Sequence, residues 1–118
     1  MIKYHFIFDK TKKSLKFKKK FLKKYKNFNP TLCKVIIVFG GDGFMLQVLK
    51  KYQKYKKPFY GVNMGTYGFL MNKFNSFDIN KNIAKAKLFT ITPLEMRATT
   101  QKNKVFKAIA VNEISLFR

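Results

Sequence analysis

The sequence predicts a three-layer α/β fold built on a parallel sheet. The run Val35–Phe39 is short, apolar and β-branched, which suits a strand buried on both faces of such a sheet. Similar strand-like runs precede and follow it, and amphipathic helical patterns separate them. Hydrophobic residues make up 47% of the 118 residues, so the chain can bury a core.

The first predicted strand covers Lys3–Phe8 and ends at Asp9. A helix is predicted over Lys12–Lys26, closed by Asn29-Pro30, with an apolar stripe toward the core and a lysine-rich outer face. A basic amphipathic helix at a membrane surface is the alternative interpretation of the same pattern. The stripe consists of Phe17, Phe21, Tyr25 and Phe28, and Leu15 and Leu22 lie on a neighbouring line.

The central strand leads through Gly40-Gly41-Asp42-Gly43 into a second helical pattern, which Lys56-Lys57-Pro58 ends. This arrangement lets backbone N–H groups and a helix N-terminus meet a phosphate. We expect glycine there because a Cβ would obstruct left-handed backbone angles and the close approach of a ligand. The helical stripe consists of Met45, Val48, Leu49 and Tyr52.

Asp42 adds a candidate catalytic carboxylate to this phosphate-binding loop. A carboxylate held beside bound phosphates can accept a proton from a hydroxyl that attacks one of them. Asp-Gly is also a common turn dipeptide, so a tight connection without chemistry is the alternative interpretation.

A third strand is predicted over Phe59–Asn63, followed by a second glycine-containing loop over Met64–Leu70. Such a loop suits a ligand that passes over the carboxyl ends of parallel strands. A turn followed by aromatic core packing is the alternative. Asp78 is expected to cap a short helix that runs to about Lys87.

After Leu88 the pattern becomes β-rich. Thr90–Gln101 and Val105–Phe117 read as an antiparallel hairpin around a turn at Lys102–Lys104. We therefore expect an α/β domain over residues 1–88 and, over residues 89–118, the first hairpin of an all-β domain that this chain does not complete.

The formal net charge of +21 points toward nucleic acid or an anionic membrane. However, the cations are 24 lysines and only two arginines, the residue preferred for bidentate phosphate and base recognition. AT-rich codon bias explains a chain rich in Lys, Asn, Phe, Ile and Tyr, so we expect no specific nucleic-acid partner. We also expect no membrane segment or signal peptide, and the single Cys33 fits a cytoplasmic protein.

With three motifs in order, the sequence resembles the NAD kinase family. Gly40–Gly43 matches its Gly-Gly-Asp-Gly motif, Gly61–Leu70 looks like its second glycine motif, and Val111–Glu113 like its Asn-Glu motif. Diacylglycerol-type lipid kinases share the first motif but would continue with a Gly-Thr-Gly-Asn-like loop. A lipid-kinase-like domain and a catalytically inactive basic polyanion-binding module are the alternatives. Phe44 departs from the family pattern, because many members have Thr there.

The resemblance implies a Rossmann-like N-terminal domain and transfer of a phosphoryl group from ATP, or polyphosphate, to the 2′-hydroxyl of the adenosine ribose of NAD, giving NADP. It implies that Asp42 is the catalytic base or orienter and also contacts NAD. Mg²⁺ would arrive with the ATP phosphates, with no metal site on the protein. The other implied contacts are Gly40, Gly41 and Gly43 to ATP phosphates, and Gly43, Phe69, Asn112 and Glu113 to NAD.

The family's β-rich second domain carries a Gly-Ser-Thr-Ala-Tyr-like stretch, and nothing in this chain matches it. We therefore expect the chain to be the N-terminal portion of a NAD kinase, and the 118 residues alone to be inactive. The resemblance also implies a homo-oligomer for the full-length form.

Overall fold

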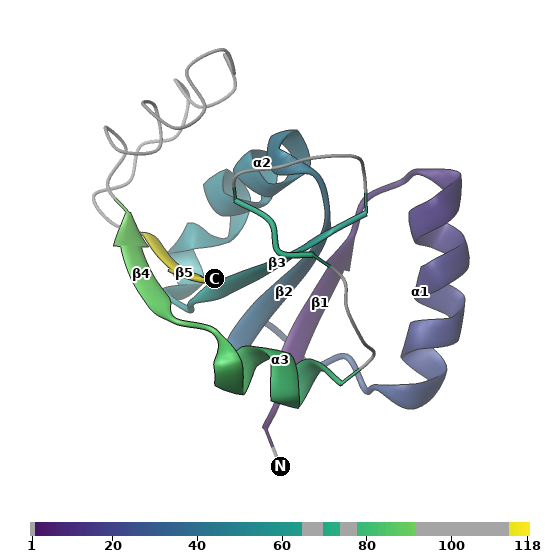
Figure 1. The fold of residues 1–118 in the computed structure, drawn as a ribbon, viewed down its shortest axis with the longest axis horizontal. Coiled ribbons are helices and arrows are strands. Elements are labelled where there is room, and N and C mark those ends of the chain that lie inside the picture. The colour runs from purple at the N-terminus through teal and green to yellow at the C-terminus, as the bar shows by residue number, and fades with distance from the viewer. Residues whose placement is uncertain (1, 65–69, 74–77, 92–113) are drawn as a thin grey trace.

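The computed structural model describes residues 2–64, 70–73, 78–91 and 114–118. Its described strands form one sheet in the order β1-β2-β3-β5-β4, in which only β4 runs antiparallel to its neighbour (Figure 1). The described strands are β1 (Tyr4–Phe8), β2 (Val35–Gly40), β3 (Phe59–Asn63), β4 (Leu88–Ile91) and β5 (Ile114–Phe117).

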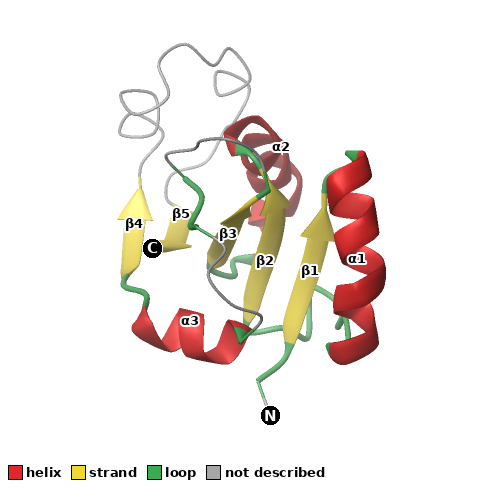
Figure 2. Cartoon of the chain, turned by 45° about the vertical axis from the view of Figure 1, so that its right-hand side comes forward, coloured by secondary structure: helices red, strands yellow, loops and turns green. Residues whose placement is uncertain are grey.

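Helices cover both faces of this sheet, with α1 and α3 on one side and α2 on the other (Figure 2). The predicted three-layer α/β architecture is therefore confirmed. The described helices are α1 (Lys12–Lys24), α2 (Asp42–Tyr52), the 3₁₀ helix η1 (Gln53–Tyr55) and α3 (Ile79–Lys85). None of the helices in the described ranges is long and apolar enough to cross a membrane.

Strand β2 lies between β1 and β3, and all six of its residues are buried. Side chains alternate across a strand, so Ile36 and Val38 pack in the core on the α2 side. Ile37 and Phe39 pack on the opposite side with Phe21 of α1. Burial on both faces explains why this run is continuously apolar rather than alternating.

Helix α1 packs through the aromatic part of its predicted stripe. Phe21 is 2% exposed, and its ring centroid lies 4.9 Å from that of Phe6 and 5.1 Å from that of Phe39. Leu15, on the neighbouring line, remains 45% exposed and lies off the core. The helix ends at Lys24, two residues before the predicted end, because Tyr25 adopts extended backbone angles.

Helix α2 packs as predicted, but it begins at Asp42, inside the glycine loop expected to precede it, and it ends earlier than predicted. Met45, Val48 and Leu49 are buried, and the regular helix stops at Tyr52. After η1, the left-handed backbone of Lys56 (φ 53°) turns the chain toward β3. The predicted bounds of β3 are confirmed.

Helix α3 begins after Asp78, as predicted. The Asp78 carboxylate accepts a hydrogen bond from the Lys81 N–H at 3.0 Å, which caps the helix N-terminus. The helix ends at Lys85, and Ile79 is the residue that it buries fully.

The antiparallel pairing predicted after Leu88 is confirmed at its described ends. Strand β4 begins at Leu88, two residues before the predicted start, and Ile91 pairs with Ile114. The two residues of each pair lie equally far along the chain from positions 102 and 103, which belong to the predicted turn. That turn lies outside the described residues.

The described parts of these two strands join the parallel sheet. Strand β5 lies beside β3 in parallel register, so the described ends of the hairpin extend the α/β sheet. Burial of Ile114 and Leu116 in the core on the α2 side accounts for this placement. Residues 92–113 lie outside the described part, so the division at residue 88 stays a prediction.

Candidate functional site

The carboxyl ends of β1, β2 and β3 meet at one edge of the sheet, and backbone hydrogen bonds join the segments that follow them. The Asp9 N–H donates to the Phe39 carbonyl at 3.0 Å, and the Met64 N–H donates to the Gly40 carbonyl at 3.0 Å. Gly40 therefore lies between the chain leaving β1 and the chain leaving β3. This is the edge at which parallel α/β sheets bind ligands.

The N-terminus of α2 lies at this edge and has no side-chain cap. Gly41 is the N-cap residue in extended conformation, and no side-chain hydrogen bond closes the helix start. The other two α-helices are capped by Thr11 and Asp78. The first amides of a helix need partners other than the helix itself, so the α2 terminus is the one at which an anion can substitute for a cap.

The three glycines of the loop differ in their surroundings. A Cβ on Gly41 or Gly43 would meet nothing within 4 Å, whereas a Cβ on Gly40 would lie 2.8 Å from Phe44 Cδ2 and 3.1 Å from Asp9 Oδ2. Gly40 therefore leaves room for protein atoms, while Gly41 and Gly43 leave open space for a ligand.

The expected left-handed backbone is wrong for this loop. No glycine in the described part of the chain has a positive φ, and Gly41 has φ −118° and ψ −175°. The chain can enter α2 with ordinary angles because the turn consists of an extended N-cap residue followed directly by helix. Space, rather than backbone conformation, is the reason for glycine here.

Asp42 is the first residue of α2 and joins the two glycine motifs. Its Oδ1 accepts a hydrogen bond from the Leu70 N–H at 3.0 Å, across 28 positions of sequence. The side chain is half-buried, and Leu70 itself is 4% exposed. The bond fixes the orientation of the carboxylate relative to the open glycine loop.

Asp9 is a site-edge residue that the sequence analysis treated only as the end of a strand. Its carboxylate lies beside Gly40 and accepts a hydrogen bond from the Thr11 hydroxyl at 3.0 Å. The available signal was its position directly after a strand parallel to β2, because parallel strands end at a common edge. The structure thus places two carboxylates, Asp9 and Asp42, around the start of α2.

Three of the predicted site residues, Phe69, Asn112 and Glu113, lie outside the described residues, so their contacts with NAD stay predictions. Among the residues that the structure describes, no group of three His, Cys, Asp or Glu side chains could hold a metal ion.

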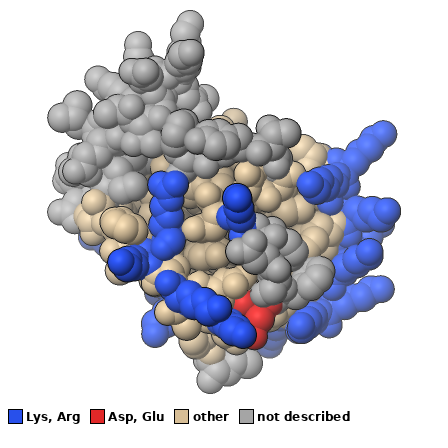
Figure 3. Space-filling view, in the orientation of Figure 1, with Lys and Arg blue, Asp and Glu red and all other residues tan. Residues whose placement is uncertain are grey.

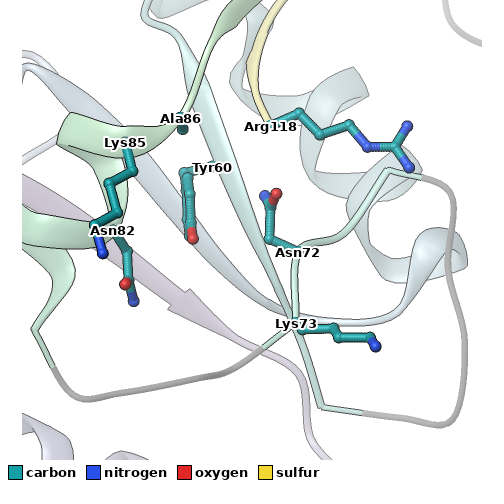
Figure 4. A pocket seen from close by; sticks show the side chains of 7 residues that line it. All are labelled: Tyr60, Asn72, Lys73, Asn82, Lys85, Ala86 and Arg118. Carbon is teal, nitrogen blue, oxygen red and sulfur yellow. The ribbon is translucent and has the colours of Figure 1, made fainter.

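An open pocket of about 220 Å³ lies between α3, β3 and the residue that follows β5 (Figure 4). Burial raises the pKa of the Tyr60 hydroxyl in its wall. Figure 4 shows the side chains of Lys73 and Arg118 extending away from Tyr60, while Lys85 lies on its other side. The cationic groups therefore do not converge on one point of the pocket.

Lysine side chains cover the outer side of α1, which forms one flank of the molecule (Figure 3). Two of them lie over aromatic rings. Lys18 Nζ is 5.9 Å from the ring centroid of Phe8, and Lys24 Nζ is 5.5 Å from that of Tyr25. These contacts hold lysine stems on the surface of the core and leave their ammonium groups in solvent.

Comparison with known proteins bears on this site. A family profile described as "ATP-NAD kinase N-terminal domain" matches residues 3–89. The chain is 40% identical over 114 residues to the NAD kinase of Brucella suis biovar 1 (strain 1330), a match that covers 97% of this chain and 44% of that protein. It is 46% identical over 84 residues to the NAD kinase of Cereibacter sphaeroides (strain ATCC 17025 / ATH 2.4.3), covering 71% of this chain and 33% of that one.

Proposed function

The chain belongs to the ATP-NAD kinase family, and we propose that it carries the phosphoryl-transfer loop of an ATP-dependent NAD kinase. The chain spans less than half the length of the curated relatives that it matches. The proposal therefore concerns the activity of a whole protein to which this chain contributes the α/β part.

In the proposed reaction the 2′-hydroxyl oxygen of the adenosine ribose of NAD forms a bond to the γ-phosphorus of ATP. The bond between that phosphorus and the oxygen bridging to the β-phosphate breaks, and ADP leaves. The hydroxyl proton passes to the Asp42 carboxylate. Such a transfer depends mainly on positioning and charge stabilisation, so the placement of Asp42 matters more than any covalent step on the protein.

The observation that carries the proposal is the Asp42 carboxylate at an uncapped helix start. The Leu70 N–H donates to one oxygen of Asp42 and so holds the carboxylate at the start of α2, where we expect it to meet the ribose hydroxyl of NAD. A base within hydrogen-bond reach of the attacking hydroxyl typically contributes about 10²–10⁴-fold to the rate.

We assign the ATP phosphates to the helix start beside Gly41 and Gly43. Both positions are open on the Cβ side, and the α2 dipole and its first N–H groups favour an anion there. Gly40 supports the loop indirectly through its packing against Phe44 and Asp9.

The remaining parts of the proposal rest on the family resemblance. Phe69 would supply a flat apolar contact to the adenine of NAD, and Asn112 and Glu113 would supply polar contacts. Mg²⁺ would be carried by the ATP phosphates, whose negative charge it neutralises. A cytoplasmic location, a homo-oligomeric full-length form and the domain division at residue 88 belong to the same proposal.

A chimaera tests the proposed function. Residues 1–118 would replace the aligned segment of the Brucella suis NAD kinase, and formation of NADP from NAD and ATP would be measured. We expect turnover comparable to that of the parent enzyme, and no phosphorylation of diacylglycerol. A folded chimaera that phosphorylates diacylglycerol but not NAD would contradict the proposal and support the lipid-kinase alternative.

The 118-residue chain alone gives a second measurement. We expect no NADP above background from it, because phosphoryl transfer is sensitive to the placement of both reactants and the chain holds only part of the proposed NAD site. Ordinary turnover by the purified chain would show that the α/β part suffices.

A further inference from the structure

Asn72 lies in the connection that follows β3, and both its backbone and its side chain form hydrogen bonds to strand residues. Its backbone N–H donates to the Gly61 carbonyl at 2.7 Å, and its carbonyl accepts from the Asn63 N–H at 2.8 Å. Its side-chain Nδ2 donates to the Gly61 carbonyl at 3.0 Å and to the Phe117 carbonyl at 3.2 Å. Figure 4 shows this side chain between β3 and the end of β5.

These bonds fix a segment that also reaches the proposed catalytic carboxylate. Leu70 lies two residues before Asn72, and its N–H is the donor to Asp42 Oδ1. Between them, Met71 is 5% exposed and its sulfur lies 2.5 Å from the position that a Cβ on Gly61 would occupy. The short path from Asn72 to Leu70 therefore has little freedom to shift along β3.

We propose that Asn72 is a positioning residue for Asp42: it anchors the segment after the second glycine motif so that the Leu70 N–H meets the Asp42 carboxylate. This inference rests on the proposed function, because it assigns a purpose to the orientation of Asp42. It concerns a residue outside the three motifs that carry the family resemblance.

The chemistry of the side chain explains why an amide occupies this position. A primary amide has two N–H donors on one nitrogen, so it can serve two carbonyls at once. A hydroxyl has a single donor, and an apolar side chain would leave the Phe117 carbonyl without this partner at a half-buried place.

The bond to Phe117 extends the anchor to a second part of the proposed NAD site. Phe117 belongs to β5, which pairs with β3 and directly follows Glu113 in the chain. Asn72 therefore links β3 and the Asp42 contact to the strand that leads out of the Asn-Glu motif.

The kinetic test uses the chimaera described above with Asn72→Ala and the near-isosteric Asn72→Leu, and Lys73→Ala as the matched control. Lys73 is the next residue and is exposed. We expect both Asn72 variants to raise KM for NAD about tenfold and to lower kcat, with KM for ATP changed less than about twofold. Each kcat is normalised to the folded fraction of the variant, so a mere loss of folded protein leaves the normalised kcat and both KM values unchanged, and that result would overturn the proposal.

A structural readout is independent of any kinase activity. Amide hydrogen exchange of the 118-residue chain would be followed by NMR, comparing the Leu70 N–H with the Ile37 N–H in the centre of β2. In Asn72→Ala we expect exchange at Leu70 to become at least about tenfold faster while exchange at Ile37 stays unchanged. Equal acceleration at both amides, or no change at Leu70, would show that Asn72 does not position this contact, whatever the chimaera does with NAD.

Discussion

Two neighbouring strand-to-helix connections in this molecule have the same topology, but a side chain caps the helix start in only one of the two. The β1–α1 and β2–α2 connections both lead from a parallel strand through a short turn into a helix. In the first, the Thr11 side chain accepts a hydrogen bond from the Ser14 N–H at 3.2 Å and closes the helix start. In the second, Gly41 provides no side chain and the helix start stays without such a cap.

The acidic residues of the two connections differ in the same way. Asp9 Oδ1 accepts hydrogen bonds from the N–H and the hydroxyl of Thr11, two residues later in its own turn. Asp42 instead binds the Leu70 N–H, which comes from the connection after β3. The comparison teaches that the hydrogen bonds of the first connection stay within its own turn, whereas the connection proposed to act on a ligand is held by a residue from another connection and has no side-chain cap on its helix.

The largest expected effect separates the two carboxylates. In the chimaera, Asp42→Asn should lower kcat by about 10²–10⁴, because the amide cannot take the hydroxyl proton. Asp9→Asn, the matched change after the neighbouring strand, should leave kcat within about threefold. Steady-state NADP formation measures both. If the two variants behaved alike, the distinction between a self-contained and a catalytic connection would fail.

The next effect concerns packing at the loop. Gly40→Ala should destabilise the chain by about 1–3 kcal/mol, because its Cβ would overlap the Phe44 ring and press on the Asp9 carboxylate. Gly43→Ala, which meets open space inside α2, should instead be neutral or stabilise by up to about 0.5 kcal/mol. Denaturant unfolding of the two variants checks the opposite signs, and equal destabilisation would contradict the described geometry.

Removal of the cap from α1 should have a smaller and purely structural effect. Thr11→Ala is expected to cost about 1 kcal/mol in the free energy of unfolding, the usual worth of an N-cap side chain. Neither KM of the chimaera should change by more than about twofold. A changed KM for ATP would mean that the β1–α1 connection also takes part in binding.

The smallest effect on stability comes from adding a cap where there is none. Gly41→Ser should stabilise the chain by a few tenths of a kcal/mol, because its hydroxyl can accept from the first amides of α2. The same hydroxyl would compete with phosphate for those amides, so KM for ATP should rise severalfold. A stabilised variant with unchanged KM for ATP would show that the ATP phosphates do not bind at this helix start.

Local patterns carried much of the fold prediction. The continuous apolar run of β2, the helical spacing after Gly43 and the capping residue Asp78 are properties of short stretches, so they could be recognised without knowledge of distant contacts. The place of β5 could not, because insertion between β3 and β4 depends on which buried face accepts Ile114 and Leu116.

The sequence by itself determined the central part of the site: a buried strand, a glycine loop that contains a carboxylate, and the helix that follows. Only the tertiary structure decided what holds that carboxylate, since the Leu70 N–H and the Asn72 anchor approach from a different connection. It also decided that Gly40 serves protein packing while Gly41 and Gly43 face open space. The physical reason is that residue type and spacing encode local conformation and burial, whereas the partner of a polar group depends on how separate segments meet.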